Sequence, residues 1–239
     1  MNTAESQPAN KKKKVKKQPW QIVIKDRFLT NEKPDNPYIV ALLYFFVFFM
    51  SFLLVFVCFF QLCEVHKESM MDTLNNGDHV LLLKEVSSYK RGDIVVITKD
   101  VKVNNVTTKT NIIKRVIGIP GDTLRFVLDK EKNDGTVILY IKKANESEFN
   151  LYYEPYIKEP MKKGTAGFPS DFAFDKDIVV VEEHVFVMGD NRAVSEDSRG
   201  KDGLYPISSI YGKSIMTVKN GSALEFLLKF LYRDNNSLY

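Results

Sequence analysis

An uncharged stretch from Asn36 to Cys63 constrains this chain more than any other feature of its sequence, because 28 consecutive residues there carry no formal charge. Its apolar part, residues 38–60, spans about 35 Å as an α-helix, enough to cross a hydrocarbon core of about 30 Å. A cleavable signal peptide has a shorter apolar region that ends in small residues. Residues 61–67 (QLCEVHK) offer no such cleavage site, so the sequence predicts a permanent membrane anchor over residues 37–63.

The distribution of charge predicts how this anchor is oriented. Residues 1–36 contain nine Lys and Arg against four acidic residues, whereas the whole chain carries a net charge of only +4. Because basic flanks of a membrane span stay in the cytoplasm, we expect a cytoplasmic N-terminal tail and an extracytoplasmic domain from residue 64 onward. The excess of lysine is confined to one tail, which argues against a nucleic-acid-binding surface on the folded domain.

Cysteine and histidine are too sparse for a metal site or a disulfide framework. The chain has two Cys and three His, and their scatter leaves no four-ligand zinc pattern. Cys58 and Cys63 are expected on different faces of one helix, where they cannot bridge each other. The domain beyond the anchor has no cysteine and needs no oxidative folding. We therefore expect no metal and no cofactor.

The chain beyond the anchor has the pattern of a mainly β fold. Short runs rich in Val, Ile and Leu are bounded by turn residues, and no helical pattern of 10–15 residues separates them, which favours antiparallel sheets over βαβ units. Asp134-Gly135 predicts a hairpin turn between residues 126–128 and 137–141. Residues 144–176 are expected to form a mobile excursion with few core residues. The predicted strands are residues 79–83, 93–98, 111–119, 124–128, 178–181, 184–188 and 214–218.

A short helix is predicted near the C-terminus. Ser222 and Glu225 form a capping pattern, and the leucines that follow recur on one helical face. About 10–12 residues are too few to cross a bilayer. Two placements stay open: the helix packs on the β domain, or it lies in the membrane interface.

Three clusters of polar residues could carry chemistry, while other patterns have simpler explanations. The Arg91-Gly92-Asp93 tripeptide fits a turn, and Gly212-Lys213-Ser214 lacks the first glycine of a phosphate-binding loop. His66 and His184 lack the neighbours of a Ser-His-Asp triad. The remaining clusters are residues 69–74 (SMMDTL), 114–122 (KRVIGIPGD) and 188–199 (MGDNRAVSEDSR).

Taken in order, these clusters resemble the motifs of the bacterial type I signal peptidases. The resemblance also includes residues 91–95 (RGDIV) and 153–159 (YEPYIKE), and it extends from the anchor to about Val218. It implies an antiparallel β catalytic domain with a small β cap, held on one N-terminal membrane helix. By resemblance, the substrates are precursors that carry signal peptides, and cleavage follows small-x-small sites.

The same resemblance assigns Ser69 as the nucleophile and Lys114 as the general base, with Ser195 bonded to the lysine amine and Asp197 and Arg199 as a supporting ion pair. The backbone N–H of Ser69 is expected to contribute to the oxyanion hole. The chemistry is reasonable, because a serine needs a base and a lysine serves only when its pKa falls from about 10.4 by roughly 3 units. Burial in an apolar strand can supply such a shift.

Two positions depart from the family pattern. Asp72 stands where the family has proline, which removes a rigid φ angle and adds a charge near the nucleophile. Lys67 stands two residues before the serine, where many relatives have a hydroxyl residue or glycine, so a side-chain oxyanion donor of the serine type is missing.

The sequence therefore predicts a single-span membrane serine protease, monomeric and with the bilayer and signal-peptide-bearing precursors as its partners. Two rivals remain: a Ser/Lys protease for one dedicated exported substrate, and a degenerate module that binds signal sequences without cutting them. The predicted segments are a basic tail (1–36), an anchor (37–63), a catalytic β domain (64–125 and 183–219), a cap (126–182) and a C-terminal helix and tail (220–239).

Overall fold

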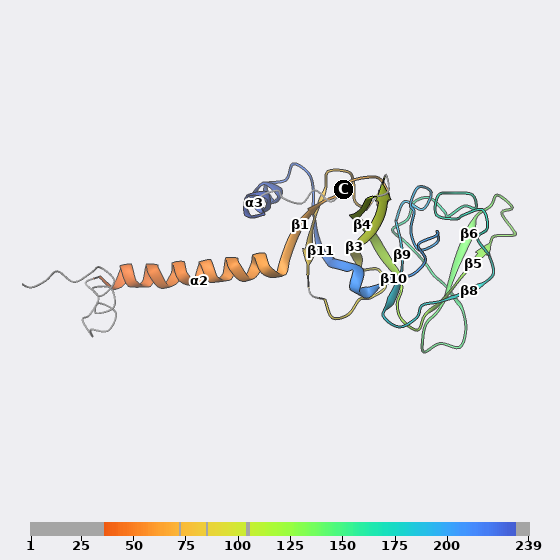
Figure 1. The fold of residues 1–239 in the computed structure, drawn as a ribbon, viewed down its shortest axis with the longest axis horizontal. Helices are drawn as coiled ribbons and strands as arrows, with labels where there is room; N and C mark the ends of the chain where they lie inside the picture. Colours follow the sequence, from red (N-terminus) through yellow and green to blue (C-terminus); the bar gives the residue numbers. More distant parts are fainter. Residues whose placement is uncertain (1–35, 72, 85, 104–105, 233–239) are drawn as a thin grey trace, which may run out of the picture. The chain divides into compact units, whose positions relative to one another are not determined.

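A computed structural model describes residues 36–71, 73–84, 86–103 and 106–232. These residues form a mainly β protein with two antiparallel sheets, one long N-terminal helix and one short helix near the C-terminus, as Figure 1 shows. The predicted fold class is confirmed.

Helix α2 (Pro37–Phe59) is long and apolar enough to cross a membrane, and none of its residues is buried in the protein. It begins where the Asn36 side chain accepts a hydrogen bond from the Tyr38 N–H at 2.9 Å, with Pro37 in the first helical position. The Ser51 hydroxyl donates to the Val47 carbonyl at 2.8 Å, so this polar group is satisfied within the helix.

The helix ends before the expected end of the anchor at Cys63. Strand β1 (Phe60–Glu64) follows directly and pairs with β2 (His79–Leu83), so the expectation that Cys58 and Cys63 share one helix is wrong. From the sequence alone, the last residues of an uncharged segment cannot be assigned to the membrane or to the core of a sheet, because both environments favour apolar residues. Here Leu62 and Cys63 are buried in the protein, and pairing with β2 decides their conformation.

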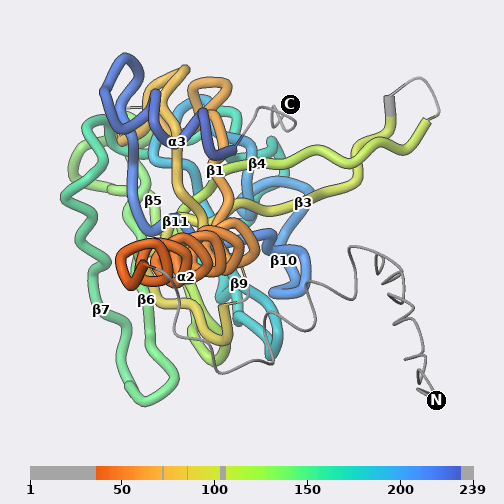
Figure 2. The backbone as a smooth tube through the Cα atoms, turned by 90° about the vertical axis from the view of Figure 1, so that its left-hand side faces the viewer, coloured from red at the N-terminus to blue at the C-terminus, as the bar shows by residue number. Residues whose placement is uncertain are grey.

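A seven-stranded sheet carries most of the chain's functional motifs. Its order is β1-β2-β11-β3-β4-β9-β10, and every neighbouring pair is antiparallel. The long strands β3 and β4 lie in the middle of this order. They continue as a paired two-stranded arm beyond the other strands, from Thr98 paired with Asn111 to Val103 paired with Val106 (Figure 2). This arm was not predicted, because Lys, Thr, Asp and Asn residues interrupt its few valines. The strands not yet given are β3 (Ile94–Val103), β4 (Val106–Gly118), β9 (His184–Met188), β10 (Tyr205–Pro206) and β11 (Ile210–Val218), with a 3₁₀ turn at Ile207–Ser209.

The second sheet has four strands in the order β7-β6-β5-β8. Its hairpin joins β5 (Thr123–Leu128) to β6 (Val137–Lys142), and Gly135 takes a φ of 80° in the connection, so the predicted Asp134-Gly135 turn is confirmed. Strands β7 (Asn150–Leu151) and β8 (Asp177–Val179) complete the sheet.

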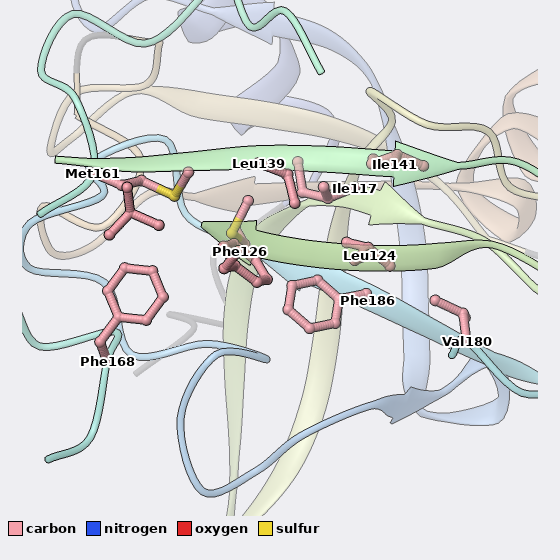
Figure 3. Close-up of a cluster of buried hydrophobic side chains, with 11 residues drawn as sticks. Ile117, Leu124, Phe126, Leu139, Ile141, Met161, Phe168, Val180 and Phe186 are labelled. Atoms are coloured by element: carbon pink, nitrogen blue, oxygen red, sulfur yellow. The ribbon is translucent and has the colours of Figure 1, made fainter. Parts of the chain in front are cut away.

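Residues 144–176 are better packed than the sequence suggested. Met161 and Phe168 are buried in the core around Phe126, in a cluster drawn in Figure 3, and Phe172 and Phe174 pack against it. The Phe126 and Phe168 rings meet edge to face with centroids 5.6 Å apart. The segment has few fully buried apolar residues, as predicted, but the sequence did not show that its aromatic residues pack on the Phe126 core, because isolated aromatic residues among Pro, Gly and acidic residues show no periodicity.

Helix α3 (Ala223–Leu231) forms where the capping pattern predicted it, and the Ser222 hydroxyl accepts a hydrogen bond from the Glu225 N–H at 3.1 Å. Its Leu228 is buried against Leu62, Leu81 and Val218 of the large sheet. Of the two placements left open by the sequence, the structure shows the contact with the β domain, through Leu228.

Candidate active site

The loop between β1 and β2, parts of β3 and β4, and the loop of Val194 and Glu196 line an open pocket of about 840 Å³. Ser69 and Lys114, which the sequence predicted as a pair, both line this pocket. Ionisable side chains of both signs surround them: Glu64, Lys67, Glu68, Lys99 and Glu196.

Ser69 is held at the pocket wall by its neighbours in the chain. Met70 and Leu74 are buried in the core, so the turn that carries the serine is anchored by apolar packing. The Ser69 carbonyl accepts a hydrogen bond from the Asn191 N–H at 3.0 Å. The serine itself stays half-buried, with its side chain within reach of the pocket.

Lys114 lies in β4 and is only 3% exposed. Its amine donates a hydrogen bond to the Ser195 hydroxyl at 3.0 Å. That hydroxyl in turn donates to the Asp197 carboxylate at 2.7 Å, so the proton of Ser195 is engaged and its lone pair faces the amine. The structure therefore brings together three of the predicted residues in one buried chain of hydrogen bonds.

Burial is the main reason why the pKa of Lys114 falls from 10.5 to about 8. Asp197 opposes this fall, whereas the positive charges of Lys99 and Arg199 add to it. A pKa near 8 means that an appreciable fraction of the amine is neutral at physiological pH, as a general base requires.

The predicted pair of Asp197 and Arg199 forms a bidentate, fully buried ion pair, with N–O distances of 2.8 and 2.9 Å. Burial alone would raise the pKa of Asp197, but the Arg199 guanidinium and the hydrogen bonds from the Gly189 N–H and Ser195 outweigh it and lower the pKa. Asp197 therefore stays ionised and holds Ser195 in one orientation. The Arg199 guanidinium also lies over the Phe168 ring, 4.9 Å from its centroid.

Comparison with known proteins agrees with this geometry. A family model described as signal peptidase, peptidase S26, matches residues 38–219. The chain belongs to the peptidase S26 family of signal peptidases. Its relatives include a signal peptidase I P from Bacillus subtilis subsp. natto, 37% identical over 62% of this chain and 71% of the relative. A signal peptidase I from Bacillus licheniformis is 34% identical over 68% of this chain and 78% of the relative.

This membership makes the chain an enzyme, a peptidase of the bacterial type I signal peptidase kind. The long apolar helix α2 fits a membrane-anchored member of that family. Among the described residues there is no group of three or more His, Cys, Asp and Glu side chains placed to hold a metal ion.

The sequence motifs of this signal peptidase also contain a framework that residue-by-residue reasoning missed. Asp190 binds the Arg115 guanidinium through two hydrogen bonds, at 2.8 and 2.6 Å, and accepts a third from the Thr73 hydroxyl at 2.6 Å. Asp190 thus ties the loop of Ser69 to the residue that follows Lys114. The Gly-Asp-Asn-Arg motif was a signal for this role, but only the fold shows which arginine the aspartate meets.

A second buried ion pair fixes the linking segment 153–159 to the same motif. Arg192 is fully buried and binds Glu154, which also accepts a hydrogen bond from the Tyr156 hydroxyl at 2.5 Å. The Tyr156 ring in turn lies 4.0 Å from the Arg115 guanidinium. The segment is therefore linked to both Arg192 and Arg115.

Of the two departures from the family pattern, Lys67 has a visible structural consequence. Its φ angle is 72°, in the left-handed region that favours glycine. A lysine at this position therefore stores backbone strain two residues before Ser69. Asp72 lies outside the described residues.

We predict that Gly189→Ala severely damages the site. A Cβ atom at Gly189 would fall within 3.0 Å of the Ser195 hydroxyl and of the Ser69 carbonyl, so the two segments must move apart. Because a displacement of about 1 Å can cost about 100-fold in rate, we expect kcat/KM to fall by at least that factor.

Gly200→Ala is the matched control, because its Cβ atom would meet only the Asp197 carbonyl at 3.4 Å. Rates measured on one precursor should separate the two variants, and equal activity of both would contradict the proposed crowding at Gly189.

Proposed function

We propose that this chain is a membrane-anchored serine endopeptidase that removes signal peptides from exported precursors, with Ser69 as nucleophile and Lys114 as general base. The observation that carries the proposal is a buried lysine amine of lowered pKa in the same pocket as a serine at the family's nucleophile position. The names of the relatives support the substrate class.

In the proposed reaction, the neutral Lys114 amine takes the proton of the Ser69 hydroxyl while the oxygen attacks the scissile carbonyl carbon. The negative charge moves to the carbonyl oxygen, where the Ser69 N–H stabilises it. The Lys114 ammonium then gives its proton to the leaving amine, which departs as the N-terminus of the mature protein. Water hydrolyses the acyl-enzyme through the same base, and Ser69 is regenerated.

Ser195 and Asp197 act in this scheme as positioning residues. Ser195 accepts one N–H of the amine, which leaves the lysine lone pair free to point elsewhere in the pocket. Because Asp197 holds the Ser195 proton, the hydroxyl cannot turn around and donate to the lysine. The arrangement supports a base that is both desolvated and oriented.

The distance from the span suits a membrane-bound substrate. Ser69 follows the end of α2 at Phe59 by ten residues, which reach at most about 35 Å when extended. A signal peptide is itself an apolar segment with its cleavage site just beyond it. The proposed cleavage after small-x-small sites and the proposed action on many precursors rest on the family resemblance. The alternative, a Ser/Lys protease for one dedicated exported substrate, differs only in its range of substrates.

We further propose an N-in orientation and a monomer. The lysine-rich segment before α2 supports the orientation. A degenerate binding module is disfavoured, because Ser69, Lys114 and Ser195 are all present and Lys114 and Ser195 are hydrogen-bonded.

Ser69→Ala and Lys114→Met should each lower kcat/KM on a precursor in liposomes by at least about 1,000-fold, because nucleophile and base act as a unit. The double variant should be no worse than either single variant. Ser147→Ala and Lys130→Met are matched controls at exposed sites and should behave like the wild type. Full activity of either pocket variant would refute the assignment of the dyad.

Activity should depend on pH through Lys114. Below a pKa of about 8 the amine is protonated and cannot accept the serine proton, so kcat/KM should fall about tenfold per pH unit on the acidic side and level off above pH 8. A profile that is flat between pH 5 and 9 is incompatible with a lysine base.

The orientation of the chain in the membrane can be measured in intact cells, where an added protease reaches only the outer face of the membrane. Externally added protease should digest the domain beyond residue 64 and spare a tag at the N-terminus. An untagged control and lysed cells show that the tag is cleavable once exposed. Loss of the tag in intact cells would reverse the proposed topology.

A further inference from the structure

Helix α3 packs Leu228 against the large sheet but leaves other large apolar side chains exposed on its outer side. Phe226 and Phe230, one helical turn apart, are each 81% exposed, and Leu227 is 56% exposed. Glu225 is only 6% exposed and lies against the sheet. A helix whose outer side faces water usually carries polar residues on that side.

Specific contacts fix the orientation of α3 about its own axis. The Glu225 carboxylate accepts a hydrogen bond from the Gly221 N–H at 2.6 Å and lies 3.3 Å from the buried His79 ring of β2. Lys229, one turn later, approaches the same carboxylate at 2.9 Å. Glu225 therefore shares the inner side of the helix with Leu228, and Phe226 and Phe230 lie on the outside.

The end of α3 touches the last turn of α2. The Tyr232 ring lies 6.1 Å from the Phe56 ring, and its hydroxyl donates to the Phe56 carbonyl at 3.5 Å. Leu231 and Tyr232 also pack with Phe60 on the cluster around Leu228. Phe56 belongs to the proposed membrane span, so whatever contacts it lies at the level where the span leaves the bilayer.

We propose that α3 is a second membrane contact, in which Phe226, Phe230 and Leu227 lie in the interface of the bilayer leaflet where α2 ends. The inference rests on the proposed membrane anchoring by α2. At nine residues α3 is too short to span the membrane, but an amphipathic helix of this kind can lie along the interface with its apolar side about 5–10 Å deep. Tyr232, with an apolar ring and a polar hydroxyl, is a residue type favoured at that depth.

This contact would orient the active site, because the start of α3 is tied to the loop after Ser69. The Asp78 carboxylate accepts hydrogen bonds from the Lys219 amine at 2.8 Å, the Asn220 N–H at 3.3 Å and the Asn75 N–H at 3.0 Å. A domain held by one helix can swivel about it, whereas a second contact fixes the height of the Ser69 loop above the membrane.

The test is the depth of single tryptophans in the full chain, reconstituted at a low protein-to-lipid ratio in vesicles of phosphatidylcholine and phosphatidylglycerol. Trp20, the only natural tryptophan, is replaced by Phe. Phe226→Trp and Phe230→Trp report on α3. Phe48→Trp, in α2, is the control for anchoring, and Tyr153→Trp is the matched exposed aromatic control, 79% exposed after β7 of the four-stranded sheet.

We expect lipids brominated on their acyl chains to lower the emission of the two α3 tryptophans about twofold, as for a side chain within 5–10 Å of the acyl boundary. The Tyr153→Trp emission should be unchanged. Quenching at position 48 without quenching at 226 and 230 would overturn this proposal and leave the anchoring intact. Blue-shifted but unquenched emission at 226 would show a contact with another protein copy and would also overturn it. Absence of quenching at 48 would overturn the anchoring and this proposal together.

Discussion

The burial of one lysine amine is the constraint on which the rest of this structure depends. Lys114 lies almost without solvent contact in a strand of apolar neighbours, and its desolvation lowers its pKa to about 8. A buried amine needs at least one polar partner, and Ser195 provides it. Because burial penalises the charged amine, a larger fraction of Lys114 is neutral than of a lysine in water, and this neutral form can act as a base.

The partner of the amine is held in turn by a framework of buried charges. Ser195 is oriented by Asp197, and Asp197 is kept ionised by Arg199. A separate contact between Asp190 and Arg115 connects the serine loop to the lysine strand. Removing one partner of such an ion pair leaves an uncompensated buried charge. We therefore expect the loss of any of these residues to displace both the Ser69 hydroxyl and the Lys114 amine.

In the proposed arrangement the bilayer is a second solvent for this protein, and the two helices contact it differently. Helix α2 exposes apolar residues on all its sides and buries none of them in the protein. Helix α3 exposes Phe226 and Phe230 while it buries Glu225. The same physical rule, that apolar surface avoids water, explains both arrangements if lipid lies where these residues point.

The sequence by itself determined the apolar helix, the antiparallel β class and the capped C-terminal helix, because hydrophobic run length, short β-type runs and capping residues are local signals. It also supplied the predicted site residues through ordered motifs, whose catalytic roles remain predictions. Only the tertiary structure decided that residues 60–64 form a strand, that residues 144–176 carry core aromatics, and that Glu225 turns inward. In each case the deciding partner is distant in the chain: β2 for β1, Phe126 for Phe168, and His79 for Glu225. Local patterns hold no information about such partners, because packing between remote segments selects among conformations that the local sequence allows equally.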